Sequence, residues 1–228
     1  TWQLYRFIGN QGLLYWVYDH PDAIHKLMSS MLEDRIALFD FFEREGLLAL
    51  NTDSQMAGPR SYGYVSDLPD PDSQDQVRLQ NLWGWAESQE FETISPAMYE
   101  EFVLPYLAKL SERFGLVYYG CCERIDDRLE PILKAIPNLR SVSISGWSNL
   151  QKTADMLGKN YVYSRKPTPA HISGPDPDWA LLEKDMRDTY AAARDCNVEI
   201  LYRDVYTING DRSRLRKWVD MTKSIFQI

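Results

Sequence analysis

Short β-rich runs and helical periods alternate along most of this chain, and this alternation constrains its fold more than any other feature. Runs such as LVYYG (116–120) and LRSVSIS (139–145) have the β-branched and aromatic composition of buried strands. The segments between such runs repeat apolar residues every three or four positions, as one face of an amphipathic helix requires. Strands that alternate with helices predict a parallel sheet with helical crossovers.

The expected elements follow from these periods and from their end signals. The expected strands are residues 47–50, 82–88, 116–120, 139–145, 160–166 and 198–204. The expected helices are residues 22–42, 96–114, 124–136, 148–158, 178–196 and 211–226. Ser95 and Ser148 are the expected N-caps of two helices, and Gly46, Gly115 and Gly158 are expected to end helices.

Two architectures fit this order of elements: an open doubly wound sheet and a closed (β/α)8 barrel. The open dinucleotide-binding version needs a glycine-rich phosphate loop, and neither G-x-G-x-x-G nor G-x-x-x-x-G-K occurs in the sequence. The sequence therefore favours a TIM barrel. We expect residues 1–228 to form a single domain that holds the C-terminal six or so β/α units, with the remaining two strands ahead of Thr1.

Charge, hydropathy and cysteine content exclude several classes of function. Thirty-three acidic against 25 basic residues give a net charge of −8, and no basic run is interleaved with aromatic residues, so no nucleic-acid partner is expected. The longest uncharged apolar stretches, such as residues 12–18, are too short for a membrane span. Three cysteines, two of them adjacent, do not make a disulfide framework, so we expect a reducing cytoplasm.

One long irregular stretch, residues 51–81, is rich in Gly, Pro, Ser and Asp. A loop of this length is usually a lid, a binding loop or disordered, and we expect it to lie over the strand ends. Tyr62 and Tyr64 within it could cap an aromatic or tetrapyrrole ligand, or could pin the loop to its own domain.

The carboxyl ends of the strands are where a (β/α)8 barrel builds its active site, and here they are rich in ionisable groups. The residues at these ends are Asn51, Asp53, Glu87, Ser88, Gln89, Glu90, Cys121, Cys122, Glu123, Ser145, Trp147, Arg165, Lys166, Asp204 and Tyr206. We predict that Glu87, Cys121 and Glu123 are catalytic. The predicted substrate-binding residues are Asp53, Trp147, Arg165, Lys166, Asp204 and Tyr206.

Several of these residues also have a purely structural interpretation. Cys121 and Cys122 could be two small buried residues, and neighbouring side chains of an extended backbone point to opposite faces. Glu87 and Glu90 could divide acid and base roles, with Glu87 preferred because it is nearer the strand, or could simply be solvated.

Arg165 and Lys166 also allow two interpretations. A cation at a strand end could bind a carboxylate or phosphate of a substrate, or could pair with an acid of the chain itself. Because successive strand residues alternate, only one of the two is expected to face the cleft.

Three stretches carry a family resemblance: ISPAMYEEFVLPYLAKLSERFGLVYYGCCERID, IPNLRSVSIS and YVYSRKPTPA. The chain resembles the uroporphyrinogen decarboxylase superfamily from about Asp22 to its C-terminus, and especially the branch of cobalamin-linked methyltransferases and their relatives. The resemblance implies a (β/α)8 barrel. It also implies either cofactor-free decarboxylation of tetrapyrrole acetate groups or zinc-dependent methyl transfer between a corrinoid and a thiol or similar acceptor.

The sequence departs from the motifs of both activities. The methyltransferase branch typically places His-x-Cys at the end of the strand that reads LVYYG here, with a further Cys near the last strand. This chain has Tyr119-Gly120-Cys121, and Tyr206 and Ile208 lie near its last strand. A zinc site would therefore rest on Cys121, joined by a carboxylate. The anionic-substrate motifs of the decarboxylases lie largely near the N-terminus of the family, outside this chain.

The expected function is that of a methyltransferase-like member with a degenerate metal site. A small acceptor or methylated substrate would bind at the strand ends, with zinc as a metal cofactor and a corrinoid presented by a partner protein; a homodimer is also expected. One alternative is uroporphyrinogen decarboxylation, with Arg165 or Lys166 holding the acidic side chains of the tetrapyrrole. The other is a non-catalytic barrel that acts as a binding module.

Overall fold

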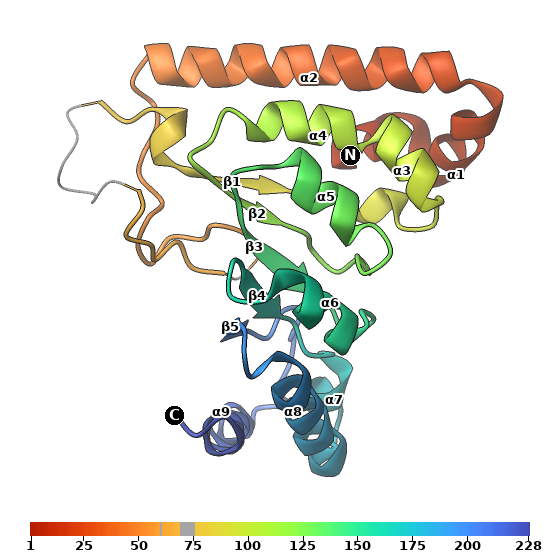
Figure 1. Cartoon of the computed structure of the whole chain (residues 1–228). Coiled ribbons are helices and arrows are strands. Elements are labelled where there is room, and N and C mark those ends of the chain that lie inside the picture. Colours follow the sequence, from red (N-terminus) through yellow and green to blue (C-terminus); the bar gives the residue numbers. More distant parts are fainter. Residues whose placement is uncertain (60, 69–75) are drawn as a thin grey trace.

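The computed structural model describes residues 1–59, 61–68 and 76–228, and it is a mixed α/β fold with a parallel sheet flanked by helices (Figure 1). The strands are β1 (Trp83–Ala86), β2 (Leu116–Tyr119), β3 (Leu139–Ile144), β4 (Val162–Arg165) and β5 (Asn197–Ile200). The α-helices are α1 (Trp2–Asp19), α2 (Pro21–Arg44), α3 (Pro96–Phe102), α4 (Leu104–Ser111), α5 (Leu129–Ala135), α6 (Leu150–Leu157), α7 (Ala170–Ser173), α8 (Trp179–Ala193) and α9 (Ser213–Phe226). Two short 3-10 helices are η2 (Leu79–Asn81) and η3 (Gln89–Phe91). Within the described ranges, no helix combines the length and the apolar character that crossing a membrane requires.

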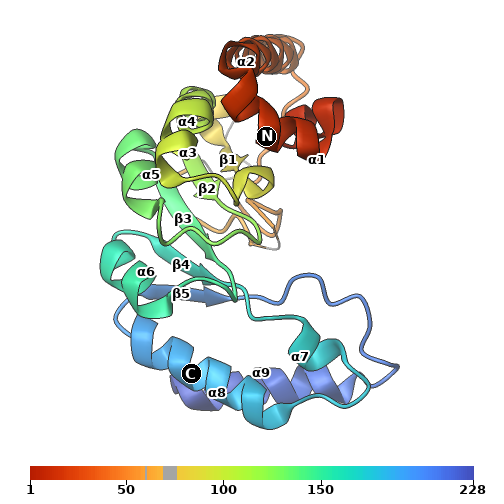
Figure 2. The same ribbon diagram turned by 90° about the vertical axis from the view of Figure 1, so that its right-hand side faces the viewer.

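The sheet is parallel throughout, and its spatial order β1-β2-β3-β4-β5 follows the order of the chain. A doubly wound sheet would reverse this order at one point. Crossovers of one hand between consecutive strands place their helices on the same face of the sheet. Accordingly, α4, α5, α6 and α8 form an outer arc along one face (Figure 2). The predicted parallel sheet with helical crossovers is confirmed.

Residues 47–50, predicted to be a strand, form none, and this prediction is wrong. Leu47 is 60 % exposed, and the edge of β1 is occupied by the side chain of Asn51 instead. The Asn51 amide accepts a hydrogen bond from the Trp83 N–H at 2.9 Å and donates one to the Trp83 carbonyl at 3.0 Å. In the part of the chain described here the sheet therefore has five strands and is not closed into a ring, so barrel closure stays a prediction.

Proline and polar caps set the helix ends. The predicted helix 96–114 is two helices, α3 and α4, because Pro105 lacks the N–H that would continue the hydrogen-bond ladder. Ser95 caps α3 as predicted. The cap of α6 is Asn149 rather than Ser148, because the side-chain oxygen (Oδ1) of Asn149 accepts a hydrogen bond from the backbone N–H of Lys152.

The two faces of the sheet are covered differently. Val117 and Tyr119 of β2 are buried in the core beneath the helices. Leu116 and Tyr118 of the same strand face the other way and pack with Ala57 and nearby apolar residues of the segment 51–68. This segment therefore covers the face of the sheet opposite the helices, whereas we expected the loop over the strand ends. Residues 60 and 69–75 of the predicted loop lie outside the described residues.

Gly58 allows the segment 51–68 to approach the sheet closely. A methyl group at this position would lie 2.2 Å from an atom of the Tyr118 ring, which is far inside contact distance. We expect Gly58→Ala to displace the segment and to accelerate its cleavage by a protease, with the far-ultraviolet circular dichroism of the protein unchanged. Ser54→Ala, at an exposed position of the same segment, is the matched control. Equal cleavage rates for the two variants would contradict this packing.

Candidate functional site

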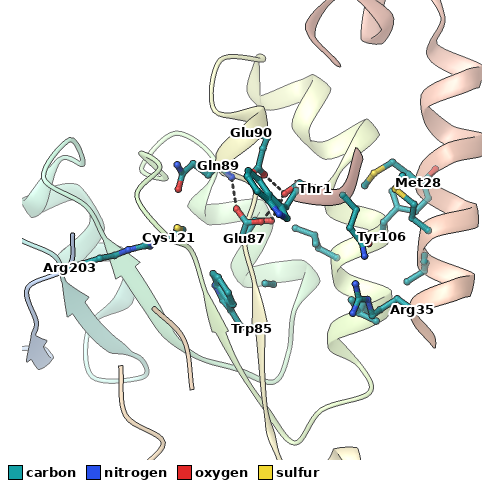
Figure 3. Close-up of a pocket in the computed structure, with 17 residues that line it drawn as sticks. Thr1, Met28, Arg35, Trp85, Glu87, Gln89, Glu90, Tyr106, Cys121 and Arg203 are labelled. Carbon is teal, nitrogen blue, oxygen red and sulfur yellow. Dashed lines mark hydrogen bonds between the residues drawn. The ribbon is translucent and has the colours of Figure 1, made fainter. Parts of the chain in front are cut away.

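A pocket of about 590 Å³ opens at the carboxyl ends of β1 and β2 (Figure 3). Its polar side includes Glu87 and Glu90 after β1, Cys121 after β2 and Arg203 from the segment after β5. Its apolar side comes from α2 and α4, through the residues Met28, Met31, Leu32, Leu107 and Leu110. The pocket therefore combines a reactive polar end with an apolar wall, as small-molecule sites do.

Glu123 joins the ends of β1 and β2 behind this pocket. The carboxylate is 1 % exposed, and its two oxygens accept the backbone N–H groups of Ser88 at 3.1 Å and of Cys121 at 2.8 Å. Burial raises the pKa of Glu123 to about 7, and hydrogen bonding to backbone N–H groups, that of Ser88 among them, opposes this rise. Glu123 does not line the pocket, so its position fits a group that holds the two strand ends in place.

The raised pKa of Glu123 predicts a pH dependence of stability. Between the ordinary glutamate pKa of 4.5 and about 7, the folded protein binds a proton that the unfolded chain has released. The free energy of unfolding should therefore fall by up to ~3 kcal/mol as pH rises through this interval. Glu123→Gln removes this term, so we expect the melting temperature of the unchanged protein to fall relative to that of the variant between pH 5 and pH 8. Glu100→Gln is the matched control. A difference in melting temperature between the unchanged protein and Glu123→Gln that does not change with pH would contradict the raised pKa of Glu123.

The two adjacent cysteines follow a bend of the backbone, whereas an extended backbone was expected there. Gly120 has a φ of +102°, in the left-handed region that favours glycine, and the chain bends directly after β2. Arg203 contacts the Cys121 sulfur, and Cys122 donates to Asp204 at 3.4 Å.

These neighbours make Cys121 an unusually acidic thiol. The neighbouring Cys122 thiol and the guanidinium of Arg203 lower the pKa of Cys121 from 9.0 to about 7, while burial and the charge of Glu87 oppose the change. The pKa of Cys122 is raised, first by the neighbouring Cys121 and then by burial. Near neutral pH Cys121 is therefore divided between thiol and thiolate, and any negative charge of the pair lies on the sulfur that faces the pocket.

Glu87 and Glu90 face the pocket beside Cys121 (Figure 3). Glu87 accepts hydrogen bonds from the Thr1 hydroxyl at 3.0 Å and from the backbone N–H of Gln89 at 3.0 Å, and Glu90 accepts from the same hydroxyl at 2.5 Å. The structure thus brings the three predicted catalytic residues, Glu87, Cys121 and Glu123, to neighbouring strand ends. Their catalytic role stays a prediction.

Arg165 and Lys166 lie outside this pocket, and their role in binding a substrate stays a prediction. Arg165 is 2 % exposed and points into the helix layer, where it donates to Asp185 at 2.6 Å. Lys166 is also buried, and its ammonium group donates to Ser164 at 2.6 Å and to Ser61 at 3.1 Å. Neither residue lines the pocket, and the structure agrees with the intramolecular alternative for Arg165.

The four other predicted substrate-binding residues also lie outside the pocket. Asp53 accepts a backbone N–H of its own loop, and Trp147 and Tyr206 are exposed side chains. Only Asp204 is close to the site, through its contacts with Cys122 and with its neighbour in the chain.

The pocket residues that the sequence analysis missed include Trp85, Arg35 and Arg203. Trp85 lies inside β1, and the alternation of a strand could have placed it opposite Ala86. Arg203 was missed because it was placed inside the strand predicted over residues 198–204. The observed strand ends at Ile200, so Arg203 lies beyond it. No sequence feature connects Arg35, on α2, with the strand ends.

The residues present do not fit the expected zinc ion. Among the described residues, no group of three or more His, Cys, Asp and Glu side chains is placed to hold a metal. Cys121, which was expected to bind zinc together with a carboxylate of Glu87 or Glu123, is contacted by the guanidinium of Arg203, whose positive charge would repel a divalent cation.

Comparison of the chain with models of known protein families, with curated proteins and with solved structures gave no match.

Proposed function

We propose that this chain is the C-terminal part of a (β/α)8 barrel enzyme of the uroporphyrinogen decarboxylase superfamily, of the methyltransferase-like branch and located in the cytoplasm. The consecutive order of parallel strands, with crossover helices on one face, supports the barrel. The position of the pocket at the carboxyl ends of the strands supports the enzyme, because barrel active sites lie there. The three cysteines are free thiols, as a reducing compartment requires.

The proposal depends chiefly on one observation, the acidic thiol of Cys121 beside Arg203 in this pocket. A group with a pKa of about 7 is well matched to accept a proton at neutral pH. We assign Cys121 as the base that takes the proton of a small thiol acceptor. Once Cys121 is protonated, the guanidinium of Arg203 is free to stabilise the acceptor thiolate, a task that a zinc ion performs in a conventional site.

The rest of the pocket would bind and orient the acceptor. The apolar wall formed by α2 and α4 would hold its carbon skeleton and exclude water. A corrinoid, presented by a partner protein above the strand ends, would supply the methyl group. The acceptor sulfur would form the new bond to the methyl carbon. The bond between the methyl carbon and the corrinoid would break, and the corrinoid would keep its electron pair.

A second candidate, decarboxylation of an anionic substrate, is favoured by Arg35. This side chain lines the pocket and stacks over Phe39, and within the described residues it forms no ion pair with a carboxylate. Together with Arg203 it would provide two cations for a substrate that carries carboxylates.

The test is transfer of the methyl group of methylcobalamin to a panel of small thiols, followed by the absorbance of the corrinoid. We expect protein-dependent demethylation that falls ~100-fold or more in Cys121→Ser, because general-base catalysis typically contributes 10²–10⁴-fold. Cys196→Ser, far from the pocket, is the matched control and should keep full activity.

The other functions give different outcomes in the same series. Release of carbon dioxide from uroporphyrinogen, without demethylation, would replace the proposal by the decarboxylase. Thermal stabilisation by either ligand without turnover would favour the non-catalytic binding module. No response to either ligand would contradict the family assignment itself.

A further inference from the structure

Trp85 is an aromatic side chain that the segment 51–68 leaves uncovered on the sheet face opposite the helices. Trp83 and Trp85 lie on the same face of β1, because successive side chains of a strand alternate. Trp83 is 6 % exposed and packs with Ala57 of the segment, whereas Trp85 is 53 % exposed. The indole N–H of Trp85 donates to the Gly120 carbonyl at 3.1 Å, which holds the ring in one orientation. A large aromatic surface is therefore fixed and exposed near the carboxyl end of the sheet.

A second cavity, of about 600 Å³, lies beside this ring. Its lining includes residues 56–59 of the segment and both tryptophans of β1, Trp83 and Trp85. Trp85 and Arg203 line this cavity and also the pocket that contains Cys121 (Figure 3). The two cavities are therefore neighbours that share the indole of Trp85.

The charges on the lining of the second cavity balance each other. Among the described residues, its charged side chains are Arg203 and Asp204, which form an ion pair at 3.3 Å. Glu87 and Glu90 line the neighbouring pocket instead, so they would repel an anion without pairing directly with a cation in this cavity. A charged ligand would lose hydration here without gaining an unpaired partner, which is costly. The lining therefore favours an uncharged ligand.

The uncharged polar groups of the lining are also hydrogen-bonded. The side-chain amide of Asn51 accepts from the Trp83 N–H and donates to the Trp83 carbonyl. The indole N–H of Trp83 donates to the Gly63 carbonyl at 2.9 Å. A ligand is therefore offered mainly apolar surface and the exposed ring of Trp85. A planar aromatic ring matches this surface, because offset stacking adds to the burial of apolar area.

We propose that the second cavity binds an uncharged planar aromatic molecule, stacked on the indole of Trp85. Met56, 63 % exposed, lines the cavity from the segment, and its backbone is held by a bridge to Tyr62. A methionine side chain adapts to irregular surfaces and makes favourable contacts with aromatic rings, so Met56 can close over the bound ring. This site goes beyond the proposed methyl transfer and does not depend on it.

The test is a ligand-observed NMR titration of the full chain with 2-naphthalenemethanol, which has a planar ring system and no charge. We expect one site per chain, with a dissociation constant on the order of 0.1 mM for a ligand with so few atoms. Trp85→Leu should weaken binding ~5-fold or more through the loss of ring stacking, whereas Trp85→Phe should retain most of the affinity. Trp147→Leu is the matched control and should bind like the unchanged protein, because Trp147 is 70 % exposed and lines neither cavity.

Two further comparisons locate the site and define its ligand. Met56→Glu adds a negative charge to the second cavity, and Gln3→Glu adds one to the pocket that contains Cys121. We expect the first variant to weaken binding ~5-fold or more and the second to leave it unchanged. The charged analogues 2-naphthoate and 2-naphthylmethylammonium should bind at least ~10-fold more weakly than the alcohol, because the lining pairs neither charge.

Three results would overturn the proposal. The first is unchanged binding in Trp85→Leu or in Met56→Glu, with circular dichroism showing that the variant is folded. The second is tighter binding of either charged analogue than of the alcohol. The third is no binding of the alcohol at millimolar concentration. The readout is equilibrium binding without turnover, so a failure of this site and a failure of the proposed methyl transfer are separate results.

Discussion

Alkylation of Cys121 at pH 6 is expected to slow ~100-fold when Arg203→Met and Cys122→Ala are combined. Thiolates, not thiols, react with iodoacetamide, and the two removed groups are those that lower the pKa of Cys121 from 9.0 to about 7. At a pH below both values, each unit of pKa is a tenfold change in the thiolate fraction. Each single variant should lie between the double variant and the unchanged protein.

The measurement is the rate of Cys121 modification between pH 5 and pH 9, followed by peptide mass spectrometry. In the unchanged protein the rate should rise with pH through a midpoint near 7. In the double variant the midpoint should move upward, because burial and the nearby charge of Glu87 then act on the thiol without compensation. Cys196 is an internal control in every sample. A midpoint that is the same in both proteins would remove the basis for Cys121 as a base.

The β/α order of the chain could be predicted because each element depends on a local period. Five of the six predicted strands overlap observed strands, and the strand-end rule brought Glu87 and Cys121 together although 33 residues separate them. The sixth prediction, residues 47–50, was wrong because an apolar run shows only that a segment suits a strand. Whether the segment pairs with the sheet depended on the Asn51 side chain, which occupies the edge of β1.

The orientation of side chains at the strand ends could not be predicted from local pattern. Along β4 and the residue after it, successive side chains alternate between the two faces of the sheet, so Arg165 lies on the face opposite to Ser164 and Lys166. The sequence does not say which face each one takes. The outcome depends on Asp185, which is distant in the sequence and pairs with Arg165 from α8. Arg203 likewise depends on where β5 stops, and the end of a strand is set by tertiary contacts more than by composition.

Arg128→Met is expected to lower the free energy of unfolding by about 3–5 kcal/mol. Arg128 is 1 % exposed and donates to the carbonyl groups of Phe91 at 3.2 Å, Glu92 at 3.0 Å and Ile94 at 3.2 Å. Its guanidinium also lies 5.0 Å from the centre of the Tyr99 ring. Methionine fills a similar volume but removes the donor of the Glu92 and Ile94 carbonyl groups, while the Phe91 carbonyl keeps the backbone N–H of Ile94, and buried unpaired carbonyl groups are costly. Urea denaturation monitored by circular dichroism measures the loss.

The matched control is Arg124→Met, at an exposed arginine of the same turn whose ion pairs lie at the surface. Exposed pairs contribute at most ~1 kcal/mol, so the control should remain close to the unchanged protein. The carbonyl groups bound by Arg128 belong to the chain directly after Glu87 and Glu90, so loss of these bonds should also loosen this side of the pocket. We therefore expect Arg128→Met to alter the Cys121 alkylation profile at temperatures below its melting transition, whereas Arg124→Met leaves it unchanged. Equal losses in the free energy of unfolding for the two variants would show that the buried guanidinium of Arg128 does not stabilise residues 91–94.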